Sequence, residues 1–222
     1  MLWPFEDRHD AGRRLAERLA AAWRGPRPLV WGVARGGVVV AQPVAERLAG
    51  DLDVVVVRKI AAPHAPEYAL GAVTAYGEPL WTDVAADLAP AALRAEWARA
   101  AQEAARRREE RYRSAGRADP AGRSVVVVDD GAATGASVRA AVRAARAAGA
   151  ATVVVALPVA TPAAADMLAG EADEVVVLLA DPDLRAVSQY YRDFGEVGDD
   201  TVLALLERSG RSGGMTRDGS GP

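Results

Sequence analysis

Two aspartates followed by small residues make the segment of this sequence best suited to chemistry. The segment Val125–Ser137 reads as four valines, Asp129, Asp130, a turn of small residues with one threonine, and the start of a helical pattern. The turn consists of Gly131, Ala132, Ala133, Thr134, Gly135 and Ala136. Small side chains let backbone amides approach an anion, and the positive end of the following helix, with the Thr134 and Ser137 hydroxyls, would complete a cradle. The segment therefore predicts binding of a monoester phosphate.

The two carboxylates beside this cradle predict a second group on the same ligand. A carboxylate would repel a phosphate, so we expect Asp129 and Asp130 to accept hydrogen bonds from a neighbouring diol such as a ribose. Adjacent strand residues point to opposite faces, so the chain must already turn at Asp130. The alternative is an ordinary strand–turn–helix unit with an aspartate cap. A P-loop does not fit because the turn has no lysine, and the glycines near residue 36 lack the spacing of a dinucleotide fingerprint.

The segment Val125–Ser137 resembles the signature with which type I phosphoribosyltransferases bind 5-phosphoribosyl 1-pyrophosphate (PRPP). That signature is a hydrophobic strand, two acids, a short turn and Thr-Gly-x-Thr/Ser. The resemblance implies that Asp129 and Asp130 hold the ribose 2- and 3-hydroxyls and that residues 131–137 hold the 5-phosphate. It further implies an enzyme in which a nitrogen nucleophile attacks C1 of PRPP while pyrophosphate leaves, accompanied by Mg²⁺ that the pyrophosphate carries, without a dedicated protein metal site.

Two other loops resemble the pyrophosphate-binding parts of the same family. Ala34-Arg35-Gly36-Gly37 follows the first predicted strand, and in the family such a loop grips pyrophosphate, often through a non-proline cis peptide. Arg58 and Lys59, which is the only lysine of the chain, follow the next strand, where the family often carries a pyrophosphate-binding base. Taken singly, the first loop also fits a glycine turn entering a helix, and the second a solvated pair at a strand end. Three loops at one sheet edge favour the functional interpretation.

The acceptor is the part of the ligand set that the sequence defines least. In this fold a variable hood covers the acceptor, and the hood candidates lie in Asp181–Phe194. They are Tyr190, Tyr191, Asp193 and Phe194. Aromatic rings could stack on a base, but the same residues could equally pack the last helix against the sheet. Ala133 stands where the family's hypoxanthine and guanine enzymes carry an aspartate, which argues against a 6-oxopurine.

Alternating strand and helix patterns supply the elements that position these loops. Buried valine-rich strands are predicted at Leu29–Val33, Asp53–Val57, Val125–Val128, Thr152–Leu157 and Glu174–Leu179. Helices are predicted at Ala11–Trp23, Val38–Ala49, Ala91–Arg113, Ser137–Ala148, Pro162–Leu168 and Asp199–Glu207. This order indicates an α/β fold with a parallel sheet between helices, whose ligands bind at the carboxyl ends of the strands. With the resemblance, it implies the three-layer type I phosphoribosyltransferase fold with a small variable hood and an inserted helical segment.

Two stretches are predicted to be irregular or hairpin-like. Ile60–Pro66 contains two prolines and is predicted as a mobile loop, and Tyr68–Thr74 with Pro79–Thr82 as a hairpin. We expect one phosphoribosyltransferase domain over residues 1–208 and a disordered tail over 209–222, which is rich in Ser, Gly and Arg. Over about residues 5–207 the chain is similar to a bacterial group of uncharacterised phosphoribosyltransferases.

Bulk composition narrows the class of partner. A net charge of −3 argues against a nucleic-acid or anionic-membrane binder, and no stretch is apolar for the roughly 20 residues that a membrane span needs. The arginine-rich helix near Arg106–Arg111 is interspersed with glutamates and is interpreted as a solvated, self-paired face. The absence of cysteine and of a signal peptide favours the cytoplasm. His9 and His64 are isolated, although His64 could touch substrate.

A regulator of the same fold is the alternative to an enzyme. Such a protein keeps the PRPP cradle but senses a nucleotide or binds nucleic acid. A nucleic-acid regulator would show a basic surface or an added domain, and neither is evident. A non-catalytic sensor of PRPP or a nucleotide stays open, as does a homo-oligomer. The expected partners are PRPP and an acceptor of unknown identity.

Overall fold

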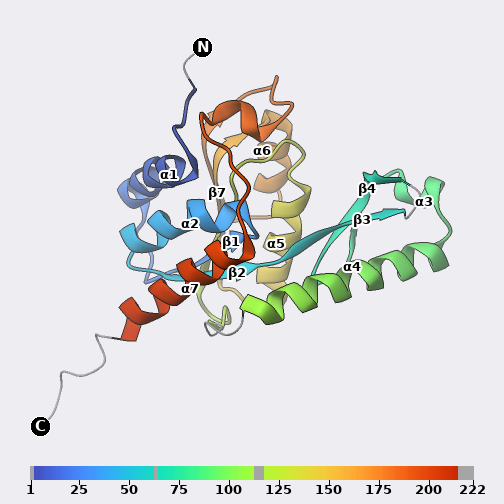
Figure 1. The fold of residues 1–222 in the computed structure, drawn as a ribbon, viewed down its shortest axis with the longest axis horizontal. Helices are drawn as coiled ribbons and strands as arrows, with labels where there is room; N and C mark the ends of the chain where they lie inside the picture. Colours follow the sequence, from blue (N-terminus) through green and yellow to red (C-terminus); the bar gives the residue numbers. More distant parts are fainter. Residues whose placement is uncertain (1–2, 63–64, 113–117, 215–222) are drawn as a thin grey trace, which may run out of the picture.

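The computed structural model describes residues 3–62, 65–112 and 118–214 of the 222-residue chain. Within these ranges the chain forms a parallel sheet covered by helices on both faces, and an arm that extends from one side of it (Figure 1).

The central sheet has five parallel strands. Its order is β2 (Asp51–Val55), β1 (Leu29–Val33), β6 (Ser124–Val128), β7 (Thr152–Ala160) and β8 (Glu174–Ala180). All five residues of β1 are buried, as expected for a strand covered on both faces. The predicted parallel-sheet α/β fold is confirmed.

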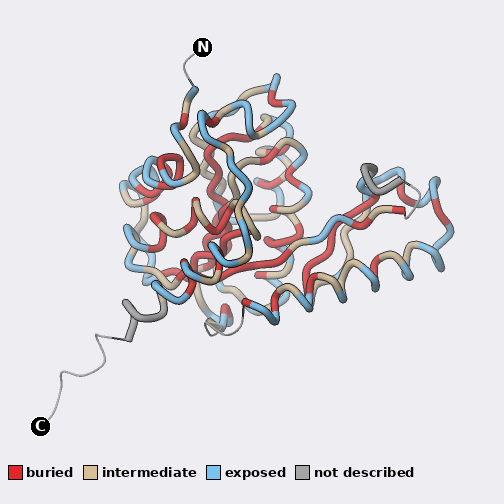
Figure 2. Tube along the Cα trace, viewed as in Figure 1, coloured by how far each residue is buried: buried red, intermediate tan, exposed pale blue. Residues whose placement is uncertain are grey.

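The valines of β6 show how the two helical layers are joined to the sheet. Val126 and Val128 point into a core formed with α1 (Arg8–Ala22), α2 (Gly36–Arg47) and α7 (Asp199–Gly214). Val125 and Val127 point into a second core with α5 (Ala136–Ala147) and α6 (Pro162–Ala169). The alternation follows from the two-residue period of a strand, and buried segments run through both layers (Figure 2). The sheet is therefore the middle of three layers.

The arm comprises residues 57–112 and contains a second, antiparallel sheet. Its strands are β3 (Val57–Ala62), β4 (Ala65–Thr74) and β5 (Leu80–Trp81), in the order β3-β4-β5, followed by α3 (Ala85–Leu88) and α4 (Ala91–Tyr112). Helix α4 runs along this sheet away from the core (Figure 1). The predicted hairpin is confirmed by the pairing of Gly71 with Trp81 and of Ala72 with Leu80.

Two predictions for the start of the arm are wrong. The second strand was expected to run from Asp53 to Val57, but β2 ends at Val55 and Val57 already opens β3. The predicted loop Ile60–Pro66 is also largely strand, because the backbone of residues 60–62 pairs with β4 and Ile60 is buried beneath α4. His64 lies outside the described residues. Arg58 and Lys59 consequently sit in a strand of the arm, not on a loop of the parallel sheet.

The disordered tail predicted from residue 209 is wrong in its first part. Helix α7 continues to Gly214, and residues 215–222 lie outside the described part of the chain. The helix buries Val202 and Leu206 against the core, and the Ser209 hydroxyl accepts a hydrogen bond from the Leu52 amide at 3.4 Å. These contacts hold the helix where composition alone indicated disorder.

The self-paired face predicted for the arginine-rich helix is correct only in part. Arg107 and Glu103 form the expected ion pair one turn apart, at 3.8 Å. Arg108 and Arg111 instead pair with Asp199 of α7, at 3.6 and 3.0 Å. Helix α4 is therefore attached to the core at this end.

Candidate active site

The turns after β1 and β6 meet because these strands are neighbours in the sheet. A Cβ at Gly36 would lie 2.1 Å from Asp130 Oδ2, and one at Gly37 would lie 2.7 Å from the Val128 carbonyl oxygen. Any side chain at Gly36 would therefore displace the carboxylate. The Ala34–Arg35 peptide bond is cis, as the resemblance implied. Two of the three predicted loops thus come into direct contact.

The acid pair leaves one oxygen of each carboxylate open. Asp129 Oδ1 accepts the Asp130 amide at 2.9 Å, and Asp130 Oδ2 accepts Arg8 Nε at 2.8 Å. Among the described residues, Arg8 is the side-chain donor that hydrogen-bonds this acid pair, and the backbone amide of Asp130 also stabilises the charged form of its own carboxylate. The bend at Asp130 is present as predicted.

Burial dominates the electrostatics of the acid pair. Desolvation, and then the neighbouring Asp130 charge, raise the pKa of Asp129 well above its usual value. Desolvation likewise raises the pKa of Asp130, although the hydrogen bond from Arg8 opposes that rise. A hydrogen-bond donor or a positive charge beside the pair would therefore stabilise the ionised carboxylates.

Arg8 was missed by the sequence analysis. It lies in the first turn of α1, contacts Asp130, and donates from Nη1 to the Gly195 carbonyl oxygen at 2.8 Å. The one signal available was its position, since an arginine in the first turn is unfavourable beside the positive end of a helix. Its partners lie more than a hundred residues away, so no local pattern could identify them.

The predicted phosphate turn has the form of an anion cradle, with one correction. Gly135 precedes α5 with φ of 72°, and Thr134 is exposed. The amides of Thr134, Gly135 and Ser137 have no acceptor within the described residues. Ala132 does not share this role, because its amide donates to the Val159 carbonyl at 2.9 Å and anchors the turn to β7.

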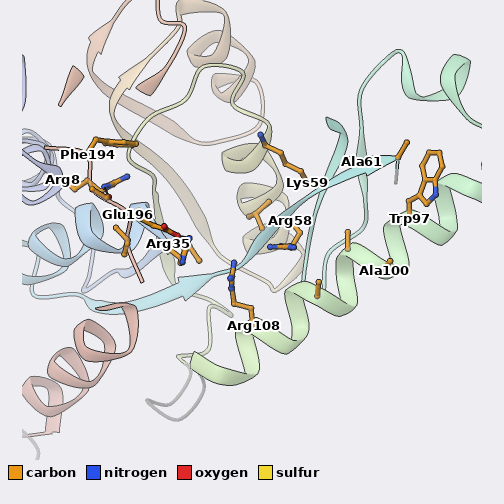
Figure 3. A pocket seen from close by; sticks show the side chains of 18 residues that line it. Arg8, Arg35, Arg58, Lys59, Ala61, Trp97, Ala100, Arg108, Phe194 and Glu196 are labelled. Carbon is orange, nitrogen blue, oxygen red and sulfur yellow. Dashed lines mark hydrogen bonds and ion pairs between the residues drawn. The ribbon is translucent and has the colours of Figure 1, made fainter. Parts of the chain in front are cut away.

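A cavity of about 920 Å³ lies between the sheet edge, the arm and the segment after Tyr191. Its walls carry five basic side chains and one carboxylate, Glu196 (Figure 3). The basic residues are Arg8, Arg35, Arg58, Lys59 and Arg108. Arg35 pairs with Glu196 at 2.7 Å. The predicted Arg35, Arg58 and Lys59 thus share one cavity, and Arg108 of the inserted helix, which the sequence analysis had interpreted as solvated, joins them.

The four hood candidates have different roles. Tyr191 is 2 % exposed, packs between Phe5 and Phe194, and donates to the Asp130 carbonyl oxygen at 2.6 Å. It therefore braces the acid pair and offers no surface to an acceptor. The alternative raised from the sequence, that these aromatic residues pack the last helix against the sheet, is not what the structure shows. Tyr191 packs instead against the N-terminal segment, in a cluster with Phe5 and Ala11.

The other three hood candidates lie nearer the surface. Tyr190 donates its hydroxyl to the Asp181 carboxylate, and Asp193 accepts the Gly195 amide at 3.0 Å. Phe194 is the candidate that lines the cavity. An acceptor in the cavity would therefore meet Phe194 and not the tyrosines.

Three further observations on the described residues concern metal binding, the histidines and membrane association. Among the described residues, no three His, Cys, Asp or Glu side chains gather to form a metal site. His9 is exposed on α1. No helix in the described ranges has the length and apolar character needed to cross a membrane.

Comparison with known proteins agrees with this geometry. Residues 5–194 match the model of the phosphoribosyl transferase domain. Two Mycobacterium tuberculosis proteins, named "Putative phosphoribosyl transferase MT0597" (strain CDC 1551 / Oshkosh) and "Putative phosphoribosyl transferase Rv0571c" (strain H37Rv), are each 44 % identical over 210 residues. These matches cover 93 % of this chain, which spans about half the length of the curated relatives (47 %).

A solved structure extends the likeness to three dimensions. The crystal structure of TT1426 from Thermus thermophilus is 48 % identical, with a TM-score of 0.79, covering 92 % of this chain and 98 % of that one. The match over residues 5–194, the identity to both relatives and the converging loops lead to one conclusion. The chain belongs to the phosphoribosyl transferase domain family.

Proposed function

We propose that this protein binds PRPP and transfers its 5-phosphoribosyl group to a nitrogenous acceptor, with release of pyrophosphate. The observation that carries the proposal is the position of the acid pair. Asp129 and Asp130, each with an open carboxylate oxygen, lie between a turn with unpaired amides and a cavity lined by basic side chains. A ribose with a phosphate on one side and a pyrophosphate on the other fits this order of groups.

Each part of PRPP has a matching part of the protein. The 5-phosphate would accept hydrogen bonds from the amides and hydroxyls of residues 133–137 at the positive end of α5. The ribose hydroxyls would donate to the two open carboxylate oxygens. The pyrophosphate would lie in the cavity against Arg35, Lys59 and the guanidinium groups of Arg58 and Arg108.

Charge neutralisation in the cavity would promote the transfer step. A nitrogen lone pair attacks C1 as the bond from C1 to the pyrophosphate oxygen breaks, and positive charge develops on the ribose. Arg35 and Lys59 would stabilise the negative charge that collects on the departing pyrophosphate. The fixed ribose would place C1 for in-line attack. Glu196 must then exchange its pairing with Arg35 for solvent when pyrophosphate arrives.

Magnesium is proposed to arrive on the substrate. Three acidic or histidine side chains do not gather anywhere in the described chain, whereas Mg²⁺ readily takes phosphate and water oxygens as ligands. When bound there, it would neutralise part of the pyrophosphate charge. Arg35 and Lys59 would bind pyrophosphate oxygens that the ion leaves free.

The acceptor is proposed not to be a 6-oxopurine. Ala133 has no carboxylate to exchange a proton with such a ring, and its carbonyl oxygen already accepts the Thr161 hydroxyl at 2.9 Å. Asp193 is engaged by the Gly195 amide, and the Glu67 side chain lies outside the described part of the structure. We expect adenine, a pyrimidine or a non-nucleobase amine to outperform hypoxanthine and guanine by about 10²-fold or more in rate.

Calorimetric titration with PRPP and with ribose 5-phosphate tests the proposed binding mode. Asp130→Asn and Thr134→Val should lower the affinity for both ligands by roughly ten- to hundredfold. Arg35→Ala and Lys59→Ala should weaken PRPP much more than ribose 5-phosphate, which lacks the pyrophosphate. Equal losses for both ligands would contradict the assignment of the basic cavity, and unchanged PRPP binding in all four variants would refute the site.

Pyrophosphate release separates a transferase from a sensor. The intact protein is incubated with PRPP, Mg²⁺ and a panel of nitrogenous bases and amines. Release that depends on one acceptor supports the transferase. Tight PRPP binding without release from any acceptor would favour the non-catalytic sensor, and rapid turnover of hypoxanthine or guanine would overturn the acceptor proposal.

A further inference from the structure

Arg8 joins three segments that are distant in the sequence. Its Nε donates to Asp130 Oδ2 at 2.8 Å, and its Nη1 donates to the Gly195 carbonyl oxygen at 2.8 Å. The guanidinium carbon also lies 3.6 Å from the centre of the Phe194 ring. The side chain is only 11 % exposed. A single guanidinium thus connects α1, the acid pair and the segment that borders the cavity.

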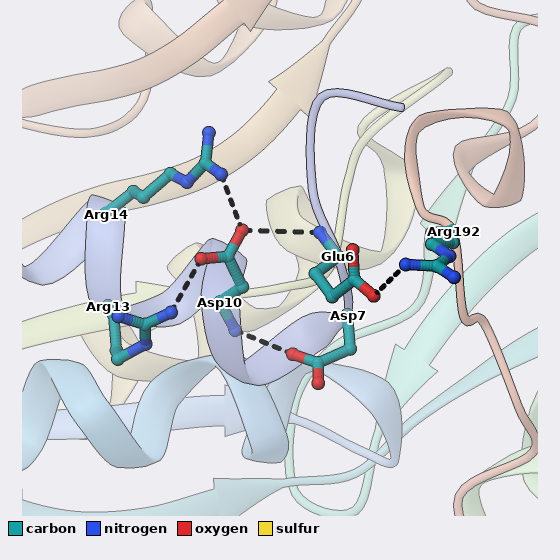
Figure 4. Close-up of polar contacts among 6 residues, drawn as sticks. All are labelled: Glu6, Asp7, Asp10, Arg13, Arg14 and Arg192. Atoms are coloured by element: carbon teal, nitrogen blue, oxygen red, sulfur yellow. Dashed lines mark hydrogen bonds and ion pairs between the residues drawn. The ribbon is translucent and has the colours of Figure 1, made fainter. Parts of the chain in front are cut away.

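The start of α1 is fixed in place, so the Arg8 side chain has a defined origin. Asp7 caps the helix by accepting the Asp10 amide at 2.7 Å, and Asp10 accepts the Glu6 amide at 3.3 Å (Figure 4). Glu6 pairs with Arg192 at 2.8 Å, which ties the same turn to the hood (Figure 4). These contacts hold the first turn of α1 on both sides of Arg8.

Arg8 is the cation that faces Asp130. The charged and titratable groups around this carboxylate are Arg8 from α1, Asp129 beside it in the turn, and Tyr191, whose hydroxyl contacts the Asp130 main-chain oxygen. Burial disfavours the ionised form of Asp130 and raises its pKa, and the Arg8 contact opposes that rise. A neutral carboxyl group would be a weaker acceptor for a ribose hydroxyl.

We propose that Arg8 is a positioning residue of the ribose site, which keeps the Asp130 carboxylate ionised, leaves its Oδ1 open for a ribose hydroxyl, and holds Phe194 and Gly195 beside it. The inference rests on the proposed function for the identity of the ligand. Arg8 itself would not contact the reacting atoms. Its effect on PRPP would be transmitted through the charge of Asp130.

The test compares Arg8→Gln, Arg8→Lys and a matched control on the same helix. Arg13→Gln removes a guanidinium that is 62 % exposed and pairs with Asp10, so it changes the net charge equally without touching the acid pair. Each protein is titrated with PRPP, ribose 5-phosphate and pyrophosphate between about pH 5.5 and 8.5. Thermal unfolding of each variant checks that it is folded.

Arg8→Gln should lower the affinity for PRPP and for ribose 5-phosphate by about tenfold or more near pH 6, with a smaller loss at high pH. Without Arg8 the carboxyl protonates at higher pH, so the pH at which binding is lost shifts upward. Affinity for pyrophosphate should stay within about twofold of wild type, since that group lies on the Arg35 side. Arg8→Lys keeps a positive charge and should follow the wild-type pH profile.

An Arg8→Gln protein with the wild-type affinity and pH profile would overturn the proposal. So would a loss that is equal for all three ligands, because that indicates a merely structural role. If Arg8→Gln does not fold, a ¹³C titration of the Asp130 carboxyl in the wild-type protein and in Arg8→Lys decides. A carboxyl that is neutral at pH 7 in the wild type would disprove it. If the wild-type protein does not bind PRPP, the proposed function is refuted. The ¹³C titration of Asp130 would still test the role of Arg8.

Discussion

The two walls of the cavity are constructed differently. At the carboxyl edge of the parallel sheet, the backbone itself approaches closely: Gly36 lies against the Asp130 carboxylate, and Ala132 is bonded to β7. The arm instead presents long basic side chains, Lys59 from β3 and Arg108 from α4, on a two-layer unit. An added side chain at Gly36 would displace Asp130 and Arg8, the charged groups on which the proposed ribose site depends, whereas a long basic side chain of the arm can adopt another rotamer. We therefore expect substitutions at the edge to abolish binding and those in the arm to adjust it.

The largest effect is expected at Gly36. A methyl group there would lie 2.1 Å from Asp130 Oδ2 and 2.8 Å from Arg8 Nε, so Gly36→Ala should reduce PRPP affinity by about a hundredfold or more. Gly198→Ala is the control, because a Cβ at Gly198 meets no atom within 4 Å. Calorimetric titration of both variants checks this. If Gly36→Ala and Gly198→Ala bind PRPP with comparable affinity, the sheet edge is no more sensitive to substitution than the rest of the molecule.

Asp129→Asn should separate stability from binding at the sheet edge. The fold raises the pKa of Asp129, so ionising this carboxyl group is less favourable in the folded protein than in the unfolded chain. The wild-type protein therefore has its full stability below about pH 4, where the carboxyl is neutral in both states, and loses stability as the pH rises through the raised pKa. The variant should therefore melt higher than wild type near pH 7.5, by about 2–4 °C for each kcal/mol relieved, and the gap should close near pH 4. It should also bind PRPP more weakly.

Differential scanning calorimetry at the two pH values provides the measurement. Asp166→Asn, an exposed position on α6, is the matched control and should change neither melting nor binding. A lower melting temperature for Asp129→Asn at pH 7.5 would show that the carboxylate stabilises the ligand-free fold, contrary to this prediction.

Two buried tyrosines allow the walls to be compared with the same substitution. Tyr191 donates to the Asp130 carbonyl at the sheet edge, and Tyr112 of the arm donates to Asp199 Oδ1, both at 2.6 Å. Tyr191→Phe and Tyr112→Phe should each lower the free energy of unfolding by about 1–3 kcal/mol. Only Tyr191→Phe should also weaken PRPP. Urea unfolding with parallel titrations checks both, and an equal loss of affinity would contradict the comparison.

The smallest effect is expected for Arg108 in the arm. Arg108→Ala should lower the affinity for PRPP by about three- to tenfold, with a larger loss at low salt than at high salt. The affinity for ribose 5-phosphate should not change. Arg107→Ala serves as control, since Arg107 is 68 % exposed and pairs with Glu103 along the helix. An effect of Arg107→Ala as large as that of Arg108→Ala would point to a diffuse field instead of a contact.

Local signals explain which parts of the molecule could be predicted from the sequence. The strand, acid pair and turn of residues 125–137 are contiguous, so their order alone indicated the fold, which the structure confirms, and the position of the candidate site. Arg8 and Arg108 depend on contacts with Asp130 and with the cavity that only the folded chain creates. The helix beyond Ser209 was missed because residues 209–214 are of poor helical composition and are carried by a helix that packs in its earlier turns.

Arg8 contacts segments that the ribosome makes at very different times. Arg8 is separated from Asp130 by 122 residues and from Gly195 by 187. Chains emerge from the ribosome at about 5–20 residues per second, so the phosphate turn exists for several seconds before Tyr191 and Gly195 are made. During that interval the two buried acids lack their brace. The proposed ligand could therefore meet the acid pair in its braced form only after the hood segment has emerged, and not while the phosphate turn is newly made.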